Sequence, residues 1–254
     1  TVLDHATGKP TPCRVAVVGP DGHFYQPQKN RLSPYAMTGK WSNKGDWGNR
    51  VDKAPWRYLG RYFYVTGETE VAVPAGNIRI EVEKGWEYAP VKKSVMIDKA
   101  EAQVVEITLE RTVPMAQHGY HNGDIHLHFP RASRNDDELI FDMLDAEDIQ
   151  FGTPLAYNEP AGPYAGSMMT MDSPQFREFG VPSLRTRGDI SILSGQEYRS
   201  IHYGHIMYYL QDRVVHEGQS FDLDDGLTYG PTSADVLADG GVANRANSQL
   251  GQSR

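Results

Sequence analysis

The sequence predicts an α+β protein of two domains, an antiparallel β-sandwich over residues 1–114 followed by an α/β domain over residues 115–254. Two observations carry this prediction. Apolar and polar residues alternate with period 2 through the first part, whereas a strand pattern, a helical pattern and a second strand pattern succeed one another after residue 114. A chain of 254 residues is long enough to bury a core in such domains.

Short apolar runs separated by turn residues predict the strands of the first domain. Ile78, Ile80 and Val82 show the alternation of a half-buried strand. The expected strands are 14–18, 61–65, 68–73, 77–83, 91–97 and 103–109, with glycine-containing turns at 19–22, 74–76 and 84–85. Because no helical pattern interrupts them, these strands favour a small antiparallel sandwich.

Residues 26–56 form a polar stretch without clear period that contains Trp41, Trp47 and Trp56. Two interpretations are open for it. The loop binds a sugar or a partner surface, or it packs its tryptophans against the rest of the protein, which is the interpretation we favour.

Composition and charge exclude several classes of partner. The net charge of −8 argues against nucleic acid or an anionic membrane surface, and no apolar run approaches the roughly 18 residues of a membrane-spanning helix. Cys13 is the single cysteine, so neither an internal disulfide nor a thiolate metal cluster is expected. We expect Cys13 to be a small, half-buried packing residue and not a nucleophile.

The second domain opens with a strand, a helix and a strand. Leu139, Ile140, Met143 and Leu144 recur at helical spacing and predict a helix over 136–148, with acidic residues in its first turn. Strands are expected at 149–155, 189–193 and 204–210, and a final helix from 232 to 242. The acidic pair 147–148 is expected at an exposed helix end.

The most informative motif lies on the first strand of this domain. Asp124, His126 and His128 occupy every second position among apolar residues, so on a strand their side chains share one face. Two imidazoles and a carboxylate in this arrangement can hold a divalent metal ion. The alternative is a solvated face of a surface strand.

Several motifs follow one another in a recognisable order. They are Asp4-His5-Ala6-Thr7-Gly8-Lys9-Pro10, Val73-Pro74-Ala75-Gly76, Glu81-Val82-Glu83-Lys84-Gly85, Gly123-Asp124-Ile125-His126-Leu127-His128, Ser194-Gly195-Gln196-Glu197-Tyr198-Arg199 and Gly204-His205-Ile206. With these motifs, most of the chain resembles the carbaryl-hydrolase-like (CehA/McbA) metallohydrolases of the PHP superfamily. The earlier motifs resemble the carboxypeptidase-regulatory-like β domain of that family.

The resemblance implies a fold and a set of functional residues. The second domain would be part of a PHP-type distorted (β/α) barrel with metals at the strand C-termini. His126, His128 and Glu197 would hold one or two divalent ions (Zn, Mn or Fe), with Glu197 able to bridge them. Asp124 would orient an imidazole, and His205 would face the substrate or lie in the outer shell, with His202 behind it.

Two departures from the family pattern qualify this interpretation. The second strand ends in Leu155-Ala156-Tyr157-Asn158, where many PHP proteins carry an Asp-His pair. The later histidine and the final Asp-x-His motif of the family lie beyond residue 254, and residues 243–251 resemble the helix before the next barrel strand. We therefore expect a second polypeptide, a C-terminal continuation or an oligomer to complete the barrel.

The predicted function is metal-dependent hydrolysis of an ester, carbamate or phosphoester bond, with a small molecule or glycan as substrate. The alternative is a catalytically inactive PHP-like extracellular protein with a structural or glycan-binding role. A start at Thr1, the scarcity of cysteine and the regulatory-type β domain favour a secreted or periplasmic bacterial protein. Whether the site is active is left open by the sequence.

Overall fold

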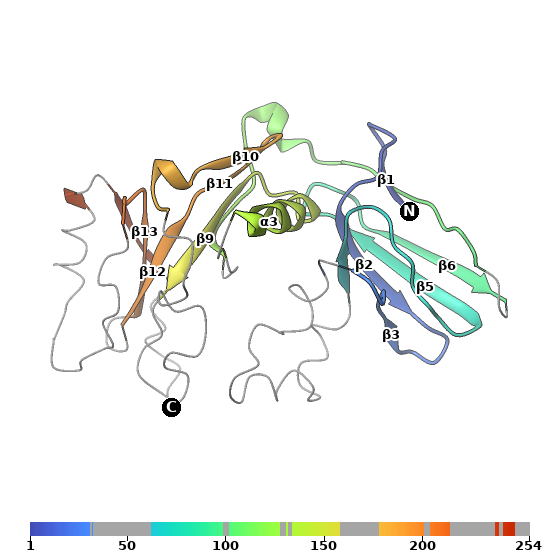
Figure 1. The fold of residues 1–254 in the computed structure, drawn as a ribbon. Helices are drawn as coiled ribbons and strands as arrows, with labels where there is room; N and C mark the ends of the chain where they lie inside the picture. The colour runs from blue at the N-terminus through green and yellow to red at the C-terminus, as the bar shows by residue number, and fades with distance from the viewer. Residues whose placement is uncertain are drawn as a thin grey trace. The chain divides into compact units, whose positions relative to one another are not determined.

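The structure is a computed structural model, and it describes residues 1–30, 32, 62–98, 102–127, 131, 134–157, 178–200, 204–213, 237–238 and 241–246. These residues are mostly β structure, with the helix α3 (Asn135–Ala146) (Figure 1). Contacts divide the chain into two units. Unit 1 comprises residues 1–122 and 141–150, and unit 2 comprises residues 123–140 and 151–254.

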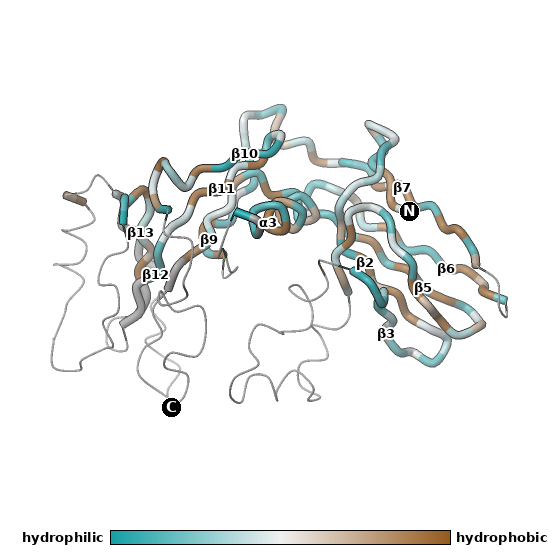
Figure 2. Tube along the Cα trace, viewed as in Figure 1, coloured by the Kyte–Doolittle hydropathy of each residue, from teal (hydrophilic) through white to brown (hydrophobic). Residues whose placement is uncertain are grey.

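Unit 1 is built on an antiparallel sheet of five strands. Its strands are β3 (Phe24–Tyr25), β2 (Cys13–Val18), β5 (Gly76–Glu83) and β6 (Val91–Ile97) in spatial order, with β4 (Phe63–Val65) also paired to β2. Hydrophobic and hydrophilic residues alternate along β5 (Figure 2). Ile78 and Val82 on this strand are almost fully buried, while Arg79 between them is exposed. The sequence pattern therefore sets which face of the sheet meets the core.

A second, two-stranded sheet completes the core of unit 1. It consists of β1 (Val2–Asp4) and β7 (Ile107–Leu109), which pair in parallel. Val2, Ile107 and Leu109 belong to the same buried cluster as Val15, Val17, Phe63 and Val82 of the larger sheet. The predicted packing of two sheets over one core is observed, although the β1–β7 pairing is parallel and not antiparallel as expected.

Most strands of unit 1 lie where the sequence places them. The expected strands 14–18, 61–65, 77–83, 91–97 and 103–109 overlap β2, β4, β5, β6 and β7. The strand expected at 68–73 is wrong. Val71 and Val73 pack against the core, but residues 68–73 pair with no strand of the described structure. The short strands β1 and β3 were not predicted.

Cys13 is more deeply buried than expected, with no exposed surface. Burial raises the pKa of its thiol to about 12. The burial and the raised pKa agree with the predicted role of Cys13 as a packing residue.

The three tryptophans of the stretch 26–56, Trp41, Trp47 and Trp56, lie outside the described residues.

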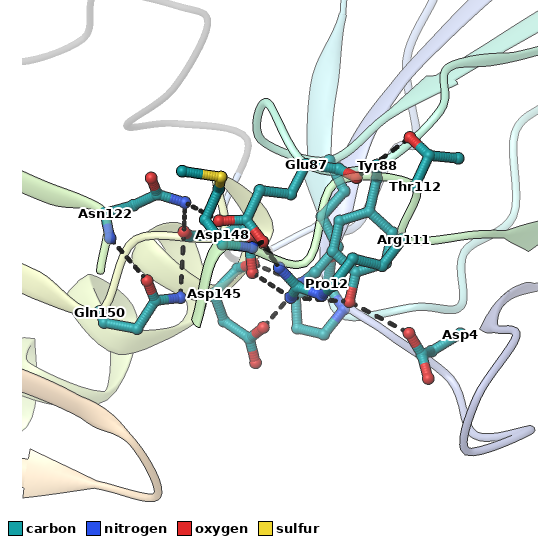
Figure 3. Close-up of polar contacts among 12 residues, drawn as sticks. Asp4, Pro12, Glu87, Tyr88, Arg111, Thr112, Asn122, Asp145, Asp148 and Gln150 are labelled. Atoms are coloured by element: carbon teal, nitrogen blue, oxygen red, sulfur yellow. Dashed lines mark hydrogen bonds and ion pairs between the residues drawn. The ribbon is translucent and has the colours of Figure 1, made fainter. Parts of the chain in front are cut away.

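A buried polar cluster follows the end of α3 in unit 1 (Figure 3). Arg111 donates to both carboxylate oxygens of Asp148, at 2.6 and 2.7 Å, and to Glu87 at 2.5 Å. Its guanidinium also lies 4.4 Å from the ring centre of Tyr88. Asp148 and Glu87 are 5% and 4% exposed. The expectation that residues 147–148 form an exposed helix end is therefore wrong for Asp148, whose charge is held inside by Arg111.

Lys84 forms a second buried contact between the sheet and the last turn of α3. Its ammonium donates to the carbonyl of Pro12 at 3.0 Å, to the side chain of Asp145 at 2.7 Å and to the Asp145 carbonyl. With 3% of its surface exposed, Lys84 is satisfied entirely by these oxygens. The predicted turn at 84–85 thus also anchors the helix.

Unit 2 contains, among its described residues, a mixed sheet of seven strands. They are β8 (Gly123–Leu127), β9 (Phe151–Tyr157), β10 (Arg185–Arg187), β11 (Ile190–Ile192), β12 (Gly195–Ser200), β13 (Gly204–Tyr209) and β14 (Val242–Ala246). β8 pairs with β9 in parallel, and β11 and β12 pair in parallel with successive parts of β9. β10, β13 and β14 extend the sheet by antiparallel pairing.

The element order of unit 2 agrees with the prediction at its start. The expected strand, helix and strand correspond to β8, α3 and β9, and the strands expected at 189–193 and 204–210 correspond to β11 and β13. The helix expected over 243–251 is wrong in its described part. Residues 242–246 form β14 because they pair along the length of β13. Among the described residues, no helix is long and apolar enough to span a membrane.

Candidate functional site

The candidate site lies on the parallel strands of unit 2. His126 is the penultimate residue of β8, and Glu197 on β12 pairs with Tyr157, the last residue of β9. β9 separates the two strands in the sheet. The side chains of His126 and Glu197 nevertheless meet across β9, with 3.4 Å between Nε2 and Oε1. The structure thus brings together two residues 71 positions apart that the sequence assigned to one site.

The two groups differ strongly in their access to solvent. The His126 side chain is 37% exposed, whereas that of Glu197 is fully buried. A buried carboxylate requires a compensating positive charge, a proton or hydrogen bonds. The imidazole of His126 therefore connects the buried carboxylate of Glu197 to a partly exposed side chain.

Asp124 shapes the backbone at this point. Its carboxylate accepts a hydrogen bond from the backbone amide of His126 at 2.9 Å. The pairing of β8 with β9 is irregular over the same residues, between Asp124 and Leu127. The sequence predicted that Asp124 orients an imidazole. The Asp124 carboxylate holds the main chain that carries His126 within the irregular segment, and the orienting role stays a prediction.

Tyr209 is a member of the site that sequence reasoning missed. From β13 its hydroxyl donates to the backbone carbonyl of Ile125 on β8, at 2.9 Å. Burial, together with the charges of Asp124 and Glu197, raises the pKa of Tyr209 to about 12. The sequence contains 14 tyrosines, and nothing in it distinguishes Tyr209 as a site residue. The pairing of β12 with β13 is what brings Tyr209 to the site.

The Tyr209 contact shows that the sheet is curled. β8 and β13 are separated by β9 and β12, and three strand spacings would measure about 14 Å in a flat sheet. A tyrosine side chain is much shorter than this span. Since the hydroxyl contacts Ile125, the strands must bend around the face that carries His126, Glu197 and Tyr209.

Gly195 makes room for the tyrosine. A Cβ atom at this position would lie 3.0 Å from Cδ1 of Tyr209, 2.9 Å from Cγ2 of Thr153 and 2.8 Å from the carbonyl oxygen of Tyr208. A side chain would therefore collide with the ring and with the neighbouring strand. Glycine at the start of β12 is what permits the close packing on this face.

A buried polar chain connects the beginning of α3 with the junction between β11 and β12. Arg131 donates to both oxygens of Asp137, at 2.6 and 3.0 Å, and to the hydroxyl of Ser194 at 2.7 Å. The Ser194 amide donates to the hydroxyl of Ser183, which in turn donates to the Gly180 carbonyl. Ser194 precedes Gly195 and Glu197, so this chain fixes the entry to β12.

The remaining predicted site residues are only partly within the described structure. His128 and His202 lie outside it. The backbone of His205 lies in β13, paired with Arg199 and Ala246. Within the described residues no group of three or more His, Cys, Asp or Glu side chains is arranged to hold a metal ion. Because His128 is not among them, the predicted triad of His126, His128 and Glu197 stays a prediction.

Comparison with known proteins identifies no relative of this chain. No family model, no curated protein and no solved structure matches the chain.

Proposed function

We propose that the protein is a metal-dependent hydrolase of the PHP type. In this proposal His126, His128 and Glu197 hold one or two divalent ions, and the bond cleaved is an ester, carbamate or phosphoester. The observation that carries the proposal is the approach of His126 Nε2 to Glu197 Oε1, at 3.4 Å, from two parallel strands.

The spacing of the two groups fits a shared ion. Zinc binds imidazole nitrogen and carboxylate oxygen at about 2.0–2.2 Å, so two ligands of one tetrahedral ion lie about 3.4 Å apart. The separation of His126 and Glu197 equals this value and is long for a direct hydrogen bond, whose usual N···O distance is about 2.9 Å. Histidine with carboxylate is also the donor set that Zn, Mn and Fe accept.

The surroundings support the proposal in two further ways. The curled sheet provides a face on which ligands from separate strands converge, as expected for part of a barrel. The hydrogen bond of Asp124 and the buried Arg131 chain hold β8 and the entry to β12 in place. A rigid support of this kind is what a metal site requires.

A bound divalent ion would lower the pKa of a coordinated water and polarise the scissile carbonyl or phosphoryl group. Glu197 supplies a buried negative charge that favours the ion over water. His126 contributes an imidazole nitrogen from a partly exposed side chain. His205 remains our choice for a donor that faces a small-molecule or glycan substrate. The same proposal includes completion of the barrel by a second polypeptide, a C-terminal continuation or an oligomer. It also includes a secreted or periplasmic location.

The proposal is tested by hydrolysis of chromogenic substrates after loading with Zn²⁺, Mn²⁺ or Fe²⁺. A nitrophenyl acetate, a nitrophenyl carbamate and a bis-nitrophenyl phosphate represent the three bond classes. The variants are His126→Gln and Glu197→Gln, and His118→Gln is the matched control because its imidazole is exposed in unit 1. We expect metal-dependent turnover in the wild-type protein and the control, with a loss of at least 100-fold in both site variants.

Two results would contradict the proposal. One is turnover that survives in both site variants, which would place the reaction elsewhere. The other is absence of turnover for all three bond classes together with absence of metal binding. That second result would favour the inactive structural or glycan-binding protein.

A further inference from the structure

The side chain of Tyr209 joins two strands that are not neighbours in the sheet. It starts on β13, passes Gly195 at the beginning of β12, and ends with its hydroxyl on the Ile125 carbonyl of β8. Ile125 lies within the irregular part of β8, between Asp124 and Leu127. The next residue is His126, which meets Glu197.

The contact is placed where it controls the distance between the two candidate ligands. β12 carries Glu197 and forms an antiparallel ladder of five residue pairs with β13, which begins at Gln196 and Tyr208, next to Tyr209. Within the residues that the structure describes, β8 pairs with β9 at three positions, and the last pair is separated from the others by the register shift. The Tyr209 hydroxyl is therefore a direct link between the ladder of Glu197 and the irregular segment of His126.

The hydroxyl is suited to act as a permanent donor. A tyrosine phenol is protonated at neutral pH, and this one donates to the Ile125 carbonyl at 2.9 Å. The acceptor is a main-chain carbonyl, so the bond fixes the backbone of β8 and not a mobile side chain. Asp124 fixes the same segment through the His126 amide, one residue further along the chain.

We propose that Tyr209 is a positioning residue of the metal site: its hydroxyl holds the Ile125 carbonyl so that His126 lies at ligand distance from Glu197. The inference rests on the proposed function for the metal, but the positioning of β8 by Tyr209 is testable without any metal. Groups that orient metal ligands typically change metal affinity by about 10- to 100-fold when they are removed.

The test compares Tyr209→Phe with Tyr88→Phe. Both changes remove one hydrogen-bonded hydroxyl, but Tyr88 lies in unit 1, where its hydroxyl contacts Arg111 and Asp4. Amide hydrogen exchange of residues 123–127 is measured first, on metal-free protein. Affinity for Co²⁺ and the visible absorption of the Co²⁺ complex, which reports ligand geometry, are measured second. The melting temperature is recorded for each variant.

We expect Tyr209→Phe to increase exchange at His126 and Leu127, to weaken Co²⁺ binding about tenfold and to change the Co²⁺ spectrum, while Tyr88→Phe does none of these. A purely structural role would lower the melting temperature of Tyr209→Phe without changing the affinity or spectrum of the folded protein, which would overturn the inference. Unchanged exchange in β8 would also overturn it. Absence of Co²⁺ binding by the wild-type protein would instead overturn the proposed function and the ligand role of His126, and the exchange result would still decide whether Tyr209 holds β8.

Discussion

Replacement of Arg111 by methionine tests whether the buried cluster of unit 1 stabilises the fold. The change leaves the carboxylates of Glu87 and Asp148, which are 4% and 5% exposed, without their cation. Removal of one partner from a buried ion pair costs about 3–5 kcal/mol. The Arg111 side chain is 32% exposed, so solvent screens part of the loss and we expect about 2–3 kcal/mol.

That loss corresponds to a fall in melting temperature of about 4–12 °C, at about 2–4 °C for each kcal/mol in a protein of this size. Urea unfolding followed by circular dichroism gives the free energy directly, provided that the slopes of the transitions agree. Arg79→Met is the matched control. Arg79 forms a surface ion pair with Glu81 at 2.9 Å and is 54% exposed, so its loss should cost less than about 1 kcal/mol.

A second change identifies the cause of the loss. Asp148→Asn added to Arg111→Met removes one uncompensated charge and should recover part of the stability. If Arg111→Met is no more destabilising than Arg79→Met, or if the added Asp148→Asn lowers stability further, the buried charges are not what Arg111 compensates, and the reasoning fails.

Three further outcomes are expected. Hydrogen bonds from Tyr25 and His23 lower the pKa of Asp21 to about 2. Tyr25→Phe should therefore raise the pKa of this carboxyl group, measured by NMR titration, toward 3.8. An unchanged pKa would contradict this. Because the folded-state pKa is the lower one, the stabilising contribution of this carboxylate is present above pH 4 and is lost as the pH falls toward 2. The thiol of Cys13 is buried and its pKa is raised to about 12. It should therefore react with a disulfide reagent at pH 8 only after urea unfolds the protein. Rapid reaction of the native protein would show that the thiol is accessible. Gly195→Ala should lower the free energy of unfolding by about 1–3 kcal/mol through the contact with the next strand, and unchanged urea unfolding would refute this close packing.

The sequence was most informative where side-chain period and burial agree. The alternation of apolar and polar residues around Ile78 and Val82 predicted β5, because one face of that strand is buried and the other is exposed to solvent. The helical spacing around Ile140 and Leu144 predicted α3 for the same reason. The stretch 68–73 has a similar alternation, but strand formation also requires a partner edge, and a local pattern does not contain that information.

Long-range pairing explains what the sequence could not supply. Residues 242–246 are a strand because β13 offers them an edge, although the family resemblance implied a helix from residue 243. Asp148 looked like a solvated acid at a helix end because Arg111, 37 residues earlier, was not recognised as its partner. In the site, the motif residues His126 and Glu197 were found in the sequence. Tyr209 was not, because its role depends on the curl of the sheet and on the space left by Gly195.

The most direct test of the central claim is the metal content of the protein. Wild-type protein, His126→Gln, Glu197→Gln and the control His118→Gln are loaded with Zn²⁺, dialysed against metal-free buffer and analysed by elemental mass spectrometry. We predict one or two ions per chain in the wild-type protein and in His118→Gln, and a clear loss in both site variants. Equal metal content in all four proteins, or none in the wild type, would contradict the claim that His126 and Glu197 form a metal site.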